Sequence, residues 1–322
     1  MVHEVLQHYL RQGSKPVLVV LDCTKAFNLT KFDILFGRLL EKLPAVVVRV
    51  LVYSYTEQVA WVKWGRNCTS ETFRIKNGTR QGSVASPVFW SVYLNPLLDE
   101  LRANGVGCHV VGLLVGVVAY VDDLVLLAPN RSAAQHMLNT CQNFAARNNI
   151  RFSTDKNPKK SKSRALYVTG HKGLNDLPVP LMLCDKELPW VEKCEHLGNT
   201  LDVTGSMEQD CRNKRAEFIG QCVKLREQFN FAHPTEVILA TEKYCWAHYG
   251  SNLRQLRCEA ASTLFSSWRT HIKLTWNLPR NTRSFFIDSL LAPDISSPRV
   301  SLMTRQSRDT DTITSSCQGH QV

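Results

Sequence analysis

The chain has 322 residues, of which 44% are hydrophobic and 21% are charged. That hydrophobic share is ordinary for a globular protein and excludes general disorder, and the length allows one large domain or two modest ones. The formal net charge of +11 favours an acidic partner, most simply nucleic acid, although a basic surface also serves solubility.

Clustering of the basic residues favours the nucleic-acid interpretation. Between Arg147 and Lys172 there are eight Lys or Arg residues and one acid, Asp155. The eleven cysteines show no regular spacing and no Cys-x-x-Cys pair, which favours reduced thiols in the nucleus or cytoplasm over a secreted disulfide framework. The apolar run Val110–Val121 is too short for a membrane span, which takes about 20 residues, so no membrane partner is expected.

Strands and helices alternate in the first part of the chain. Val17–Leu21 is a continuous apolar run with β-branched residues, which predicts a buried strand with Asp22 at its C-terminal end. Further along, the patterns predict two helices, Phe32–Leu43 and Ala45–Tyr55, and two strands that pair with each other, Val59–Trp64 and Thr69–Ile75.

The middle of the chain predicts a helix, a hairpin, another helix and a strand. The first helix begins near Ser86, and in the hairpin a strand rises to Val121 and Leu124–Ala128 returns. Ser132 is expected to cap the next helix, and Arg164–Val168 to form a strand. This order describes an α+β fold, an antiparallel sheet covered by helices on one face.

The last third of the chain is predicted to be helical. Met207–Phe231 has the pattern of one long helix, and the chain from Met303 onward is polar and is expected to be disordered. The helix carries a buried stripe formed by Phe218, Ile219, Cys222, Leu225 and Phe229. Basic residues on its other faces are solvated or contact a duplex.

Two adjacent aspartates, Asp122 and Asp123, interrupt one of the most apolar stretches of the chain. Ionised carboxylates are costly to bury without a partner, and a divalent cation with oxygen ligands is the usual one. If the strand that ends at Asp22 lies beside the hairpin, all three carboxylates meet. A pair of metal ions could then be held there for nucleotidyl transfer.

Three segments occur in the order typical of a polymerase palm: Leu21–Phe27, Arg80–Pro87 and Tyr120–Asp123. Each is weak alone, but together they are specific. The chain resembles the reverse transcriptases of non-LTR retrotransposons (long interspersed elements) over about residues 5 to 305. The resemblance implies an RNA-directed DNA polymerase whose partners are an RNA template, a DNA primer and deoxynucleotide triphosphates.

The resemblance also implies the roles of individual residues. Catalytic metal ligands for Mg²⁺, with Mn²⁺ as a substitute, are Asp22, Asp122 and Asp123. The residues assigned to substrate binding are Phe27 under the sugar, Arg80, Gln81 and Gly82 in the nucleotide and template pocket, Tyr120 beside the primer end, and Lys162 near the leaving pyrophosphate. Plainer roles remain open for several of them: a core aromatic for Phe27, a helix-capping loop for the second motif and a surface lysine for Lys162.

By this resemblance the chain divides into a palm with residual fingers (1–198), a helical thumb (199–250), a helical segment containing tryptophans (251–302) and a tail (303–322). His196–Gly198 resembles the primer-grip turn, and Asn28 stands where the family usually has aspartate. The fingers are expected to be largely missing, because few residues precede Asp22. Two alternatives are a catalytically inactive fragment that still binds nucleic acid and a two-metal nuclease.

Overall fold

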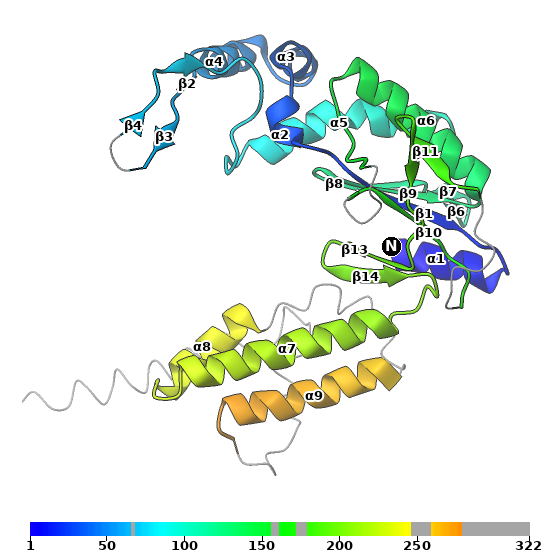
Figure 1. Cartoon of the computed structure of the whole chain (residues 1–322), viewed down its shortest axis with the longest axis vertical. Coiled ribbons are helices and arrows are strands. Elements are labelled where there is room, and N and C mark those ends of the chain that lie inside the picture. Colours follow the sequence, from blue (N-terminus) through cyan, green and yellow to red (C-terminus); the bar gives the residue numbers. More distant parts are fainter. Residues whose placement is uncertain (66–67, 156–160, 172–178, 246–258, 279–322) are drawn as a thin grey trace, which may run out of the picture. The chain divides into compact units, whose positions relative to one another are not determined.

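Figure 1 shows a computed structural model of the chain, which describes residues 1–65, 68–155, 161–171, 179–245 and 259–278. The chain divides into two compact units, Met1–Gln209 and Asp210–Val322. The boundary places the whole β13–β14 hairpin described below in the first unit. The predicted disordered tail lies outside the described residues.

A four-stranded antiparallel sheet forms the centre of the first unit. Its strands are β1 (Val17–Asp22), β8 (Val117–Tyr120), β9 (Asp123–Ala128) and β10 (Arg164–Tyr167), in the order β10-β1-β9-β8. The strand that ends at Asp22 therefore lies directly beside the second strand of the hairpin. The register pairs Val17 with Ala128 and Asp22 with Asp123.

One face of the sheet is covered by helices. Alternate residues of β1 and β9, such as Val19 and Leu126, share a buried cluster with side chains of α3 (Phe32–Leu40), α5 (Ser86–Ala103) and α6 (Arg131–Arg147). Tyr93 and Leu97 of α5 and Phe144 of α6 are almost completely buried there. The predicted α+β fold with a helical layer on an antiparallel sheet is confirmed.

The opposite face is covered as well, by elements that the sequence analysis did not include. There Leu18 and Val125 pack with Val5 and Leu6 of α1 (Val2–Arg11). The hairpin of β13 (Lys193–His196) and β14 (Asn199–Asp202) adds Cys194 and Leu201 to the same cluster. Figure 1 shows α5 and α6 on one side of the sheet and α1 with this hairpin on the other. Burial on both faces explains why β1 is apolar at every position before Asp22.

The two strands predicted to pair with each other between the first and second motifs are confirmed. Here β2 (Val59–Ala60) pairs with β5 (Phe73–Arg74), and β3 (Lys63–Trp64) pairs with β4 (Cys68–Thr69). The first unit also contains α2 (Ala26–Leu29), α4 (Ala45–Thr56) and a separate hairpin of β11 (Leu181–Leu183) with β12 (Lys186–Leu188), which lies against α6.

Two local predictions were wrong. The expected strand before the aspartates is interrupted, because β6 (His109–Val110) and β7 (Leu113–Leu114) form their own hairpin across the Val111–Gly112 turn, whose two residues have positive φ. The cap of α6 is Asn130, whose Oδ1 accepts a hydrogen bond from the Ala133 amide at 2.9 Å. Ser132 lies one residue inside the helix.

The described part of the second unit is helical. Its helices are α7 (Glu208–Gln228), which begins two residues before the boundary, α8 (Pro234–Tyr244) and α9 (Glu259–Thr275). The predicted stripe of α7 is buried at Phe218, Cys222 and Leu225, and it packs against Trp268 and Ile272 of α9. The tryptophan-containing segment therefore shares one core with the predicted thumb helix.

None of the helices in the described parts of the chain has the length and apolarity that a membrane span requires. Free thiols are found at Cys23, Cys108, Cys141, Cys184, Cys194, Cys211, Cys222 and Cys245, and of these eight only Cys184 is exposed.

Candidate active site

The three predicted carboxylates come together at one end of the sheet. Asp22 and Asp123 are direct cross-strand partners, so their side chains leave the sheet on the same face as neighbours. Asp122 lies in the tight turn between β8 and β9, directly after Val121, which has a φ of 54°. Partial burial raises the pKa of Asp123, and the charges of Asp122 and Asp22 raise it further.

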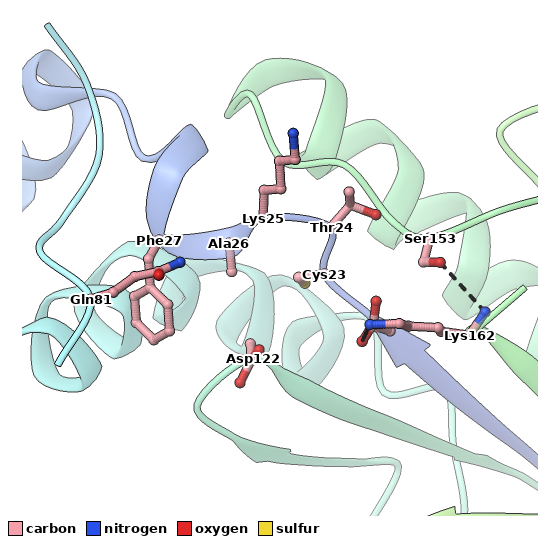
Figure 2. A pocket seen from close by; sticks show the side chains of 10 residues that line it. Cys23, Thr24, Lys25, Ala26, Phe27, Gln81, Asp122, Ser153 and Lys162 are labelled. Carbon is pink, nitrogen blue, oxygen red and sulfur yellow. Dashed lines mark hydrogen bonds and ion pairs between the residues drawn. The ribbon is translucent and has the colours of Figure 1, made fainter. Parts of the chain in front are cut away.

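A cavity of about 350 Å³ opens beside these residues. Its walls are Asp22, Cys23, Thr24, Lys25, Ala26, Phe27, Gln81, Asp122, Ser153 and Lys162. Figure 2 shows Phe27 and Gln81 on one side, Ser153 and Lys162 on the other, and Asp122 between them. The first and third motifs and one residue of the second thus meet in one cavity, whereas Asp123 is not part of its wall.

Lys162 supplies a positive charge to the carboxylates. Its Nζ lies 3.8 Å from Oδ1 of Asp22, with the lysine side chain mostly exposed. Such an exposed ion pair contributes little to stability. Its effect is to place the lysine charge beside the carboxylate. Three neighbouring lysines in the sequence, Lys156, Lys159 and Lys160, lie outside the described residues.

Two serines hold the segment around Lys162 against the end of β1. The amide of Asp22 donates to Oγ of Ser163 at 3.2 Å, and the amide of Ser153 donates to the Asp22 carbonyl at 2.8 Å. The Lys162 amide in turn donates to Oγ of Ser153 at 3.4 Å, which Figure 2 marks. The sequence analysis missed both serines, and no spacing rule points to them.

Cys23 follows the first aspartate but is a poor candidate for a metal ligand. It is buried, and burial together with the charges of Asp122, Asp22 and Asp123 raises the pKa of its thiol to about 12. Metal ligation requires the thiolate. Without a bound metal Cys23 is therefore a neutral thiol near neutral pH, and Mg²⁺ prefers the oxygen ligands around it to sulfur.

Asn28 joins the first and second motifs. The amide Nε2 of Gln81 donates to Oδ1 of Asn28 at 3.4 Å, and the backbone amide of Thr79 donates to the Phe27 carbonyl at 2.7 Å. Asn28 is the residue that departs from the family pattern. In this chain it accepts a hydrogen bond from the residue that the resemblance assigns to the nucleotide pocket.

The remaining predicted residues lie outside the cavity wall. Arg80 is exposed, and its carbonyl accepts a hydrogen bond from Oγ of Ser86 at 2.6 Å. Gly82 has a φ of +81° and open space where a Cβ would stand, so backbone conformation rather than close approach explains the glycine. Tyr120, opposite Asp123 in the sheet, is 61% exposed.

Two further residues belong to this region. His196 of the β13–β14 hairpin is buried near Asp123. Burial lowers the pKa of its imidazole, and the charge of Asp123 partly opposes that shift. The sequence around His196 resembles the primer-grip turn, but that resemblance did not predict that His196 lies near the carboxylates. Trp90 of α5 is buried against Phe27 with ring centroids 6.3 Å apart. No pattern in the sequence marks it as more than a core aromatic.

Residues 1–201 match the family described as reverse transcriptase (RNA-dependent DNA polymerase). The chain belongs to the reverse transcriptase family. This confirms the predicted family and, by family resemblance, the predicted enzyme class. A segment is also 29% identical over 92 residues to the retrovirus-related Pol polyprotein from type-2 retrotransposable element R2DM of Drosophila melanogaster, which supports the predicted retrotransposon affiliation. That match covers 29% of this chain and 9% of the relative.

Solved telomerase structures are similar to this reverse transcriptase chain at low identity. One is telomerase from Candida albicans in complex with a TWJ fragment of telomeric RNA, with a TM-score of 0.48 and 13% identity over 91% of this chain and 53% of that chain. Another is apo telomerase from Candida tropicalis, with a TM-score of 0.45 and 11% identity over 85% and 43% of the two chains. This chain thus spans about half the length of these relatives or less.

Proposed function

We propose that this chain is the RNA-directed DNA polymerase domain of a non-LTR retroelement, which extends a primer 3′-hydroxyl by two-metal nucleotidyl transfer. One observation carries the proposal: Asp22 and Asp123 are in register across two neighbouring strands, and Asp122 adjoins them in the turn. The resulting cavity also contains Phe27 and Lys162, which the family resemblance assigns to the sugar and the pyrophosphate.

The residues at this end of the sheet fit a pair of divalent cations. Three carboxylates lie together, and the upward shift in the pKa of Asp123, caused first by burial and then by the charges of Asp122 and Asp22, favours a cation beside them. Asp22 and Asp122 would hold Mg²⁺ or Mn²⁺ from the cavity wall, with Asp123 beside them. Among the described residues, no group of three acidic, histidine or cysteine side chains is arranged to hold a metal ion, so the carboxylates would have to draw together around the cations. Bound metal would stabilise the attacking and leaving oxygens.

The protein's own groups orient the reactants. Lys162, held by Ser153, places a cation where the leaving pyrophosphate would gather charge. Phe27 presents its ring at the opposite side of the cavity, where it would lie under the sugar of the incoming nucleotide. Gln81 lies next to it and is oriented by Asn28. The net charge of +11 suits a template–primer duplex of RNA and DNA.

Primer extension on an RNA template tests the proposal. The wild-type chain should extend a DNA primer with deoxynucleotides in Mg²⁺, and Asp122→Asn should abolish extension. Asp99→Asn is the matched control, because Asp99 is an exposed helix residue whose one interaction among the described residues is a surface ion pair with Arg102. Equal extension by Asp122→Asn and wild type would reject the assignment.

The same assay separates the alternatives. Salt-sensitive binding of template–primer without extension by the wild-type chain would identify an inactive fragment that binds nucleic acid. Mg²⁺-dependent degradation of a labelled strand would identify a nuclease.

A further inference from the structure

Trp90 connects two of the motifs that build the cavity. It is 1% exposed and lies near the start of α5, seven residues after Ser83 of the second motif. Its indole Nε1 donates to the Val121 carbonyl at 3.0 Å, and its ring meets Phe27 edge-to-face at 6.3 Å. One buried side chain therefore contacts both the turn that carries Asp122 and the aromatic ring beside the nucleotide cavity.

The turn needs such a contact because its backbone is unfavourable. Val121 has a φ of 54°, a left-handed conformation that β-branched residues rarely adopt. A strained conformation persists only when surrounding contacts fix it. The indole bond fixes the carbonyl of the residue directly before Asp122, and so restrains the direction in which that carboxylate leaves the turn.

The second contact acts on Phe27. The ring of Trp90 is stacked on Tyr93, with centroids 5.7 Å apart and an interplanar angle of 21°. Tyr93 is itself fixed by its hydroxyl, which donates to the Asn148 carbonyl at 2.5 Å. Trp90 is therefore a rigid surface against which the edge of Phe27 is set.

We propose that Trp90 is a positioning residue, which holds the metal-binding turn through its indole N–H and sets the position of Phe27 through its ring. The catalytic part of this inference rests on the proposed function, whereas the effect on the turn does not. Loss of the N–H should loosen the turn and weaken cation binding. Loss of the ring should in addition relax discrimination between deoxyribonucleotides and ribonucleotides.

The test compares Trp90→Phe with Tyr93→Phe in the full chain. Tyr93→Phe is the matched control for the turn, because it removes a buried aromatic hydrogen bond from the same stack and helix but leaves the indole bond to Val121 in place. Hydrogen exchange of the 120–123 segment should rise in Trp90→Phe alone. Mn²⁺ affinity, measured by electron paramagnetic resonance, should fall about three- to tenfold, as expected for one hydrogen bond.

A second substitution avoids the cavity that phenylalanine leaves. Benzothienylalanine at position 90 replaces the indole N–H by sulfur and keeps the ring, so it should loosen the turn while leaving nucleotide discrimination unchanged. Unchanged hydrogen exchange at 120–123 in both variants would overturn the proposal, as would an equal effect of Tyr93→Phe. Faster exchange and weaker Mn²⁺ binding in a chain that cannot extend a primer would refute the proposed function and leave this inference standing.

Discussion

Gly78 and Gly82 lie in the same loop, yet replacing each with alanine should have different consequences. Both have positive φ, +96° and +81°. A Cβ at Gly78 would stand 3.1 Å from the Phe27 carbonyl oxygen and 3.2 Å from backbone atoms of Asn28. A Cβ at Gly82 would have no atom within 4 Å.

The expected cost follows from these contacts. The left-handed backbone costs an alanine about 1–2 kcal/mol at either position. At Gly78 the crowding of the Phe27–Asn28 backbone adds about 1–3 kcal/mol, the usual range for overpacking. Gly82→Ala should therefore lower the free energy of unfolding by about 1–2 kcal/mol and Gly78→Ala by about 2–5 kcal/mol. Alanine also reduces the entropy of the unfolded chain, but equally for both variants.

Urea unfolding of the full chain measures the difference, provided that the urea dependence is the same in both variants. Primer extension supplies a second result, because only the Gly78 substitution displaces Phe27. Equal destabilisation of the two variants would show that the loop does not pack against the first motif as the structure has it.

Three further predictions concern single side chains. Arg38 donates to the Tyr93 carbonyl and to Oδ1 of Asn148, so Arg38→Lys, which lacks the planar fork, should cost about 1–3 kcal/mol in urea unfolding; an unchanged midpoint would contradict this. Lys162→Ala should leave the unfolding free energy within about 0.5 kcal/mol but slow nucleotide incorporation about tenfold or more, measured as single-turnover rates. Burial lowers the pKa of His3, so the unfolded chain binds its proton first and stability falls as pH drops below about 6.5. His3→Leu should shrink the loss of urea midpoint between about pH 7.5 and about pH 5.5; an equal loss in both proteins would refute the assignment.

The palm sheet could be predicted well from the sequence, because short runs of neighbouring residues mark its strands. The apolar run at Val17–Leu21 and the aspartate pair after Val121 each mark a strand end, and the order of the motifs implies that the two strands are neighbours. The helix α1 was missed although Val2, Val5, Leu6 and Tyr9 have helical spacing.

The parts of the site that sequence could not predict are tertiary contacts between positions far apart. The indole bond joins Trp90 to a carbonyl 31 residues away, and Ser163 reaches the amide of Asp22 across 141 residues. Neither serine nor tryptophan has a residue type or spacing that signals such a partner. The cap at Asn130 instead of Ser132 shows the usual uncertainty of helix ends by one or two residues.

The register of the two inner strands has a consequence for how this site fails. β1 and β9 are each hydrogen-bonded on both sides, and a slip of one residue would turn every core side chain of a strand to the wrong layer. Asp22 and Asp123 therefore cannot lose their alignment without unfolding of the entire sheet. Mild heating or dilute urea should reduce the number of competent molecules in a population, while each surviving molecule keeps its full catalytic rate.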